Sequence, residues 1–166
     1  MEKVLGQGHT ISKSVTRPSN TDAYTAGDVV GNGATITFAG AARRSGESGV
    51  IQQAIIFSSA YVATAPDMEL WLFDTTITAD ADNATFTPTD AELATLIGII
   101  EFPTADWHGG DLTAGVGGNH VCCVQNIGMP FNAIGNDSAI YGVLVIRNAY
   151  VPISAEVFTV RLQILD

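Results

Sequence analysis

The chain has 166 residues, 46% of them apolar, and seventeen Asp or Glu against seven Lys or Arg, which gives a formal net charge of −10. No Lys or Arg occurs between Arg44 and Arg147. The clustered cations that nucleic acids and anionic membranes require are therefore missing, and neither is expected as a partner. No stretch holds the ~18 uninterrupted apolar residues of a membrane span, and no apolar segment of a signal peptide follows the first lysine.

The length favours one domain, residues 1–166, with a sizeable buried core. Residues 1–14 contain both lysines and show little hydrophobic periodicity, so an extended N-terminal arm is expected there. Short apolar runs separated by turn-forming residues then predict strands. The first four are expected around residues 11–16, 28–30, 35–39 and 50–62.

The next predicted strand, residues 68–74, has bulky side chains on both faces. Met68, Leu70 and Leu72 fall on one side, and Glu69, Trp71 and Phe73 fall on the other. This pattern predicts either a central strand or an aromatic patch at a subunit contact.

One short helix is predicted near the middle of the chain. Thr89 and Glu92 have the spacing of a capping box, and Pro88 precedes them. Two helical turns are expected, because Gly98 and the β-branched isoleucines beside it favour an extended chain. A strand over residues 96–102 should follow.

The rest of the chain predicts a glycine-rich loop and three more strands. Residues 103–118 contain five glycines and are expected to be the most mobile loop. Strands are expected over 120–127 and over 140–147, the latter apolar throughout, as in a strand covered on both faces. The last strand, 156–165, alternates most clearly. Its buried set is expected to be Phe158, Val160, Leu162 and Ile164.

Together these elements predict a mostly β fold, an antiparallel jelly-roll-like β-sandwich with one short helix. The adjacent Cys122 and Cys123 would point to opposite faces of a strand, so a bridge between them would be strained. A reducing environment with at least one buried thiol is expected instead.

No catalytic centre is recognisable, so the chain is not expected to be an enzyme or to need a cofactor. Ser48, in the sequence Gly46-Glu-Ser-Gly49, lacks the G-x-S-x-G spacing of a nucleophile elbow. Four residues lack the paired spacing of a zinc site, although two of them, His120 and Cys122, share a strand face. These candidates are His108, His120, Cys122 and Cys123.

An acidic segment, Asp80-Ala-Asp82-Asn83, supplies oxygen atoms at short spacing. The acid or amide and the glycine that an EF-hand loop would need next are absent, since Ala84 and Thr85 stand there. A solvated acidic turn is the favoured interpretation, with a calcium loop of another kind left open. No metal is expected.

The N-terminal region resembles a phrase found near the start of tailed-bacteriophage structural proteins. Its core is Thr16-Arg17-Pro18, Asn20-Thr21, Tyr24 and Gly27-Asp28-Val29-Val30. Further similar stretches follow in the same order and bring the resemblance to about half of the chain. They are Leu70-Trp-Leu-Phe-Asp74, Leu96-Ile-Gly98 with Glu101-Phe102, Tyr141-Gly-Val-Leu-Val-Ile-Arg147, Ala149-Tyr150-Val-Pro152 and Phe158-Thr-Val-Arg-Leu162.

The resemblance implies a non-enzymatic capsid decoration (cement) protein with a jelly-roll-like fold. Such a protein is made in the bacterial cytoplasm and sits on the virion surface, where it binds the major capsid protein between capsomers. Self-association is implied too, as a homotrimer or else a dimer. The cysteine pair and the glycine-rich loop are not part of the family's pattern.

A cement protein needs exposed anchors, because aromatic side chains contribute much of the energy of an interface. The candidate interface residues are Trp71, Phe73, Trp107 and Phe131, with a place in the core as the alternative for each. Two other functions stay open: a minor tail or neck component of the virion, and a carbohydrate-binding jelly roll that would stack sugars on Trp71, Trp107 and Tyr150.

Overall fold

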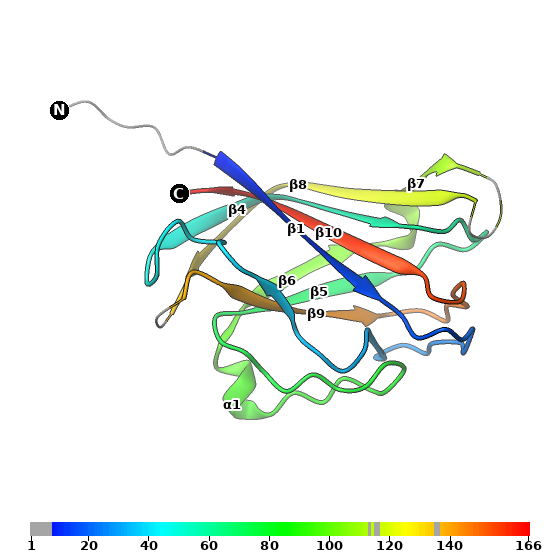
Figure 1. Ribbon diagram of the computed structural model, residues 1–166, viewed down its shortest axis with the longest axis horizontal. Coiled ribbons are helices and arrows are strands. Elements are labelled where there is room, and N and C mark those ends of the chain that lie inside the picture. Colours follow the sequence, from blue (N-terminus) through cyan, green and yellow to red (C-terminus); the bar gives the residue numbers. More distant parts are fainter. Residues whose placement is uncertain (1–7, 113, 115–116, 135–136) are drawn as a thin grey trace.

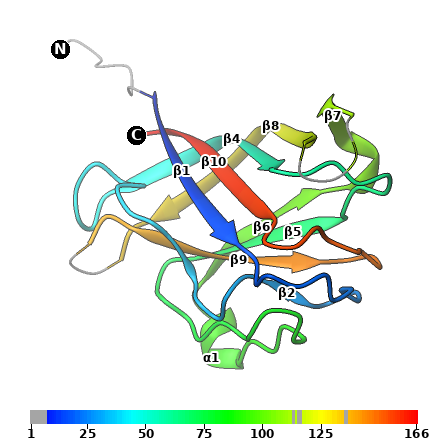
Figure 2. The ribbon, with the colours of Figure 1, turned by 45° about the vertical axis from the view of Figure 1, so that its right-hand side comes forward.

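The computed structural model describes residues 8–112, 114, 117–134 and 137–166, and in this part of the chain the strands form two antiparallel sheets. The first sheet has the order β1 (Gly8–Thr16), β10 (Val157–Leu165), β4 (Ser48–Ser58), β8 (Asn119–Asn132) and β7 (Trp107–Asp111). The second has the order β2 (Val29–Val30), β9 (Ile140–Ile146), β5 (Met68–Phe73) and β6 (Leu96–Phe102), with β3 (Ile36–Phe38) also paired to β9. Figures 1 and 2 show the two sheets stacked face to face.

The strand pairing is nested. β1 pairs with β10, β2 and β3 pair with β9, β4 pairs with β8, and β5 pairs with β6. A long antiparallel hairpin rolled into two sheets gives this order, which is that of a jelly roll. The predicted mostly β, jelly-roll-like sandwich is confirmed.

The core lies between the sheets and follows the predicted alternation. The inward side chains of β10 are completely buried: Phe158, Val160, Leu162 and Ile164. Met68, Leu70 and Leu72 of β5 meet them from the second sheet. β9 is buried along nearly its whole length, as its apolar sequence predicts, because both of its faces are covered: Leu144 and Ile146 lie in the main core, and Val143 and Val145 lie in a second cluster on the other face.

The outer face of the second sheet is covered by the chain itself. Residues 74–95 fold back over it and bring Ile77 and Phe86 onto Phe73 and Val143. This cover, with α1 (Asp90–Leu93), lies beneath β9 and β5 in Figures 1 and 2. The sandwich therefore has a second small core outside the second sheet.

The helix α1 has the predicted capping box. The Thr89 hydroxyl accepts from the Glu92 amide, and the Glu92 carboxylate accepts from the Thr89 amide. That amide, the amide of Thr78 and the Thr89 hydroxyl together lower the pKa of the Glu92 carboxyl. The helix has only four residues and not the two turns expected, because β6 begins at Leu96 in register with Phe73.

Two predictions about loops are corrected. Residues 8–14, expected in an extended arm, belong to β1, which pairs with β10 along its length and packs Ile11 and Val15 against the core. Residues 1–7 lie outside the described residues. The glycine-rich segment 103–118, expected to be one loop, contains the short 3-10 helix η1 (Thr104–Asp106) and β7, and the buried Trp107 donates to the Phe102 carbonyl at 3.3 Å. Residues 113, 115 and 116 of this segment lie outside the described residues, and its mobility stays a prediction. No helix in the described part of the chain is long and apolar enough to cross a membrane.

Candidate functional site

Two of the stretches that carry the family resemblance, the first one and the one around Tyr150, meet at one end of the sandwich. The segment after β1 runs beside the segment before β10, and the Tyr24 amide donates to the Tyr150 carbonyl at 2.8 Å. Six polar side chains gather there. We call this group the polar cluster: Arg17, Tyr24, Ser58, Asp82, Tyr150 and Glu156.

Arg17 is the centre of the polar cluster. Its guanidinium is fully buried, and its Nε donates to the Tyr24 hydroxyl. One terminal nitrogen donates to the Asn20 carbonyl and the other to the Asn20 side chain, each at 3.2 Å. The second nitrogen also lies 3.5 Å from Asp82 Oδ2. A buried cation needs such partners, because an unpaired charge in the interior is very costly.

Asp82 closes this half of the cluster from the cover over the second sheet. Its Oδ1 accepts from the Tyr24 hydroxyl at 2.5 Å and from the Gly31 amide at 3.0 Å. Burial, and then the hydrogen bond to Asp82, raise the pKa of Tyr24 above its ordinary range, so Tyr24 stays a neutral donor. The ion pair between Arg17 and Asp82 thus fixes the cover to the segment that follows β1.

Glu156 organises the other half. Its carboxylate accepts from the Tyr150 hydroxyl at 2.8 and 2.9 Å, from the Ile153 amide at 3.1 Å, and from the Ser58 hydroxyl. Burial raises the pKa of Tyr150, and the neighbouring Glu156 charge adds to that effect. The two halves touch through the Tyr24 and Tyr150 rings, whose centroids are 6.4 Å apart, and through the Arg17 amide, which donates to the Glu156 carbonyl.

The remaining motif residues shape the backbone around the cluster. Thr16 ends β1, and the Pro18 carbonyl accepts from the Asn20 and Ala155 amides. Gly27 has a φ of 101°, a conformation that side chains disfavour, and Asp28 accepts from the Thr25 amide at 2.6 Å. The six motif residues therefore either belong to the polar cluster or shape the turns beside it. They are Thr16, Arg17, Pro18, Tyr24, Gly27 and Asp28.

This arrangement is suited to holding the chain together and not to catalysis. Arg17, Tyr24, Tyr150 and Glu156 are each at most 2% exposed, so a substrate cannot reach them. Their polar atoms are used within the protein. Sequence reasoning had placed neither Asp82 nor Glu156 in this unit.

The four predicted anchors have different positions. Phe73, Trp107 and Phe131 are 0%, 9% and 4% exposed, so on the folded chain they take the core position that was the alternative for each. Trp71 is half-buried. Its Nε1 donates to Glu69 Oε2 at 2.8 Å, and Arg147, which pairs with Glu69 at 2.5 Å, lies over its ring. An interface role for Trp71 stays a prediction.

The histidine and cysteine candidates do not form a metal cluster. In the described residues, no group of three or more His, Cys, Asp or Glu side chains is placed to hold an ion. His120 packs on Tyr61 at 4.4 Å between ring centroids, and its burial lowers its pKa. Cys122 is buried, which raises the pKa of its thiol to about 11, and Cys123 is exposed. Neither thiol is part of a disulfide within the described residues.

The acidic turn uses its oxygens within the protein. Asp80 accepts from the Thr87 amide at 2.9 Å, and Asp82 is paired with Arg17. The Arg17 guanidinium is therefore the cation that lies beside Asp82.

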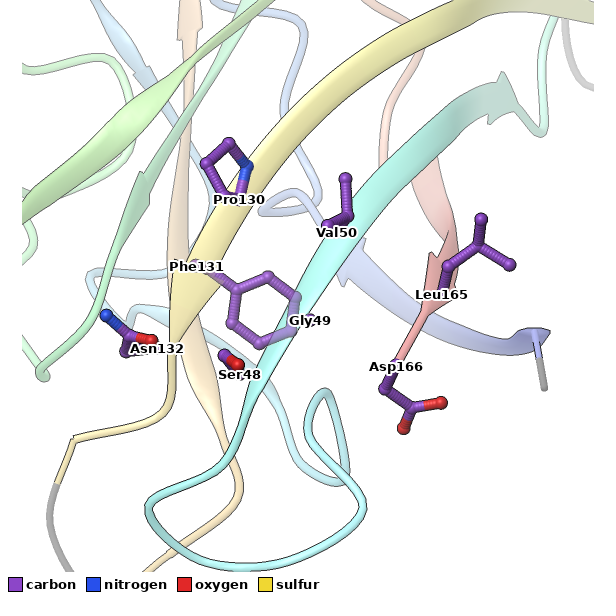
Figure 3. A pocket seen from close by; sticks show the side chains of 8 residues that line it. All are labelled: Ser48, Gly49, Val50, Pro130, Phe131, Asn132, Leu165 and Asp166. Atoms are coloured by element: carbon purple, nitrogen blue, oxygen red, sulfur yellow. The ribbon is translucent and has the colours of Figure 1, made fainter. Parts of the chain in front are cut away.

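The outer face of the first sheet has a different character. A hollow of about 710 Å³ opens at the end where β4, β8 and β10 meet. Figure 3 shows Val50, Pro130 and Leu165 around it, with the Phe131 ring beside Gly49. A Cβ atom at position 49 would lie 2.8 Å from the Phe131 ring, so glycine is needed there to make room for the ring. Phe131 is one of the residues that line the hollow. A second hollow of about 580 Å³ lies along the same face, lined by Ile55, Phe57 and Val121.

Comparison with known proteins gives structural similarity only. No family model and no curated protein matches the chain. It is similar to a chain of the cyanophage Pam1 capsid asymmetric unit, with 14% identity over 99% of this chain and 89% of that one, at a TM-score of 0.39. A chain of the capsid of Ralstonia phage GP4 matches with 11% identity over 100% and 88%, at a TM-score of 0.40. A chain of Desmodium yellow mottle tymovirus matches with 12% identity over 96% and 80%, at 0.30. Because these TM-scores are low, the fold of this chain is assigned from its own strand order and not from the superpositions.

Proposed function

We propose that this chain is a structural protein of a tailed-phage virion, and within it a capsid decoration protein that binds the outer shell between capsomers. The proposal rests mainly on the ordered resemblance, whose residues come from both ends of the chain and meet in one buried unit. Tyr24 from the first stretch stacks on Tyr150 from the stretch Ala149-Tyr150-Val-Pro152, and Arg17 from the first stretch lies over the Tyr24 ring. Unrelated short matches would not be expected to fold into one interacting unit.

The physical character of the molecule supports a role carried by its surface. The side chains of the polar cluster pair with one another inside the protein. The strands β1, β10, β4 and β8 contain no Asp or Glu. A carbohydrate-binding role has less support, because two of its three expected stacking residues, Trp107 and Tyr150, are buried. The expected partner is the major capsid protein, and the expected place is the capsid surface.

Adding the purified chain to shells assembled without it tests this function. We expect the chain to sediment with the shells and to raise the temperature at which they rupture, because a cement protein adds contacts between capsomers. An unrelated protein of similar size and net charge is the control for non-specific effects. A chain that stays in the supernatant and leaves the rupture temperature unchanged would contradict the proposal.

A further inference from the structure

The second sheet ends in a strand whose outer edge is unpaired. β6 is the end strand of that sheet (Figures 1 and 2), and within the described part of the chain it pairs with β5 alone. Its residues Gly98 to Phe102 pair with β5 in unbroken register. An edge strand directs every second amide and carbonyl away from its sheet, so β6 offers these groups to a further strand.

A groove of about 630 Å³ lies along this edge, between β6 and β8. β7 pairs with β8 only as far as Cys122, so the rest of β8 is a second open edge, and part of it lines the groove. That edge is irregular, because Asn126 and Gly128 have φ angles of 57° and 63° where the register with β4 shifts. A bulge of this kind interrupts the pairing edge of a strand. β6 is therefore the edge that can accept a strand, and β8 forms the opposite wall of the groove.

Several of the side chains that line the groove are apolar. Ile127 and Met129 of β8 are half-buried and pack against the main core, and Ile99 of β6 is 37% exposed. The two strands come close at one end of the groove, where a Cβ atom at Gly98 would lie 2.6 Å from the terminal methyl group of Met129. An extended segment in the groove would bury this apolar surface and also gain backbone hydrogen bonds.

The charge of the groove indicates which kind of segment it would accept. Glu101 on β6 lies directly opposite Glu69 on β5, and like charges in this arrangement are destabilising. Arg147 pairs with Glu69, but among the described residues neither Glu101 nor Asp106, which also lines the groove, is in an ion pair. A Lys or Arg on an added strand would supply the cation that Glu101 lacks.

We propose that the groove binds an extended, basic segment of a partner protein, which adds a strand to the edge of β6. An apolar side chain of the segment would lie beside Ile99, and a Lys or Arg two residues along would lie beside Glu101, because alternate residues of neighbouring strands share a face. An acidic segment would meet both groove carboxylates, and a second copy of this chain would bring a net charge of −10 against the same charge. This binding mode goes beyond the proposed function and does not depend on it.

A capped peptide in which valine and lysine alternate tests this binding mode on the full chain. Titration followed by backbone NMR should give saturable shifts of the β6 amides, and the exchange of these amides with solvent should slow in the complex. The same peptide with glutamate in place of lysine should bind roughly tenfold more weakly or less, because its charge repels the groove. Methylation of the backbone nitrogens of the lysine peptide should abolish binding, since it removes the hydrogen bonds to β6.

Glu101→Lys tests the charge that selects the segment. It should weaken binding of the lysine peptide roughly tenfold and strengthen binding of the glutamate peptide, a reversal that a misfolded protein would not show. The new side chain would lie opposite Glu69, an arrangement compatible with the fold. Asp22→Lys is the matched control, because Asp22 is exposed before β2 and does not line the groove. It makes the same change in net charge and should leave the preference for the lysine peptide in place.

Three results would overturn the inference: no binding of the lysine peptide at millimolar concentration, shifts that avoid the β6 amides, or a Glu101→Lys variant that binds both peptides as the wild type does. Shifts of the β6 amides that grow with the concentration of the chain alone would mean that a second copy occupies the edge, which would overturn it too. The shell experiment has a separate outcome. A chain that binds shells but not the peptide would reject this binding mode alone, and a chain that binds the peptide but no shells would reject the proposed function alone.

Discussion

Replacing Arg17 with methionine is expected to lower the free energy of unfolding by about 3–5 kcal/mol, the cost of removing one partner from a buried ion pair. Methionine fills part of the volume but leaves the Asp82 carboxylate, 8% exposed, without its cation. It also removes the donors to Tyr24 and Asn20. Urea unfolding followed by circular dichroism measures the loss.

Two further variants separate the ion pair from a general effect of losing an arginine. Arg161→Met removes an exposed arginine from β10 and should change stability by no more than about 0.5 kcal/mol. Combining Arg17→Met with Asp82→Asn should cost less than the sum of the two single changes, because the unpaired charge is then gone. Additive losses would mean that Arg17 and Asp82 do not act as a pair. A loss under about 1 kcal/mol for Arg17→Met would mean that the polar cluster does not hold the fold together.

Replacing Phe158 with alanine is expected to cost about 3–5 kcal/mol, the range for a large aromatic removed from a packed core. Phe158 is 0% exposed, and its ring centroid lies 6.4 Å from that of Tyr150. Its loss therefore opens a cavity beside the polar cluster. The same unfolding measurement applies.

Phe57→Ala is the matched control, since it makes the same substitution on the neighbouring strand. Phe57 lies on the opposite face of the sheet and is 38% exposed, so its truncation leaves a smaller buried void. We expect a clearly smaller loss than for Phe158→Ala, measured at a concentration where the protein is monomeric. Equal losses would contradict the assignment of the two faces.

Local patterns predicted the individual elements well. The alternation of β10 and the uniform apolar sequence of β9 follow directly from whether one or both faces are covered. The capping box located α1 because its contacts are local. β1 was harder, because its row of core-facing residues includes Lys13, which is exposed at the sheet edge and interrupts the apolar pattern.

The polar cluster could be predicted only in part. The motif marked Arg17 and Tyr24, but their partners Asp82 and Glu156 lie far along the chain, and only the nested strand order brings them together. An arginine in a turn gives no sign in the sequence that it will be buried.

The sequence also could not say which aromatic side chains are exposed. Phe73 points away from the main core, and residues 74–95 cover it. Trp107 and Phe131 face inward as register partners of Cys122 and Gly49. The first sheet did have a signal, since its strands β1, β10, β4 and β8 lack acidic residues in a strongly acidic chain.

Cryo-EM of the virion that carries this chain tests the central claim most directly. We expect density for the jelly roll at repeated positions on the outer surface of the capsid, between capsomers. Density confined to the tail or neck, or no density for the chain in the particle, would contradict it.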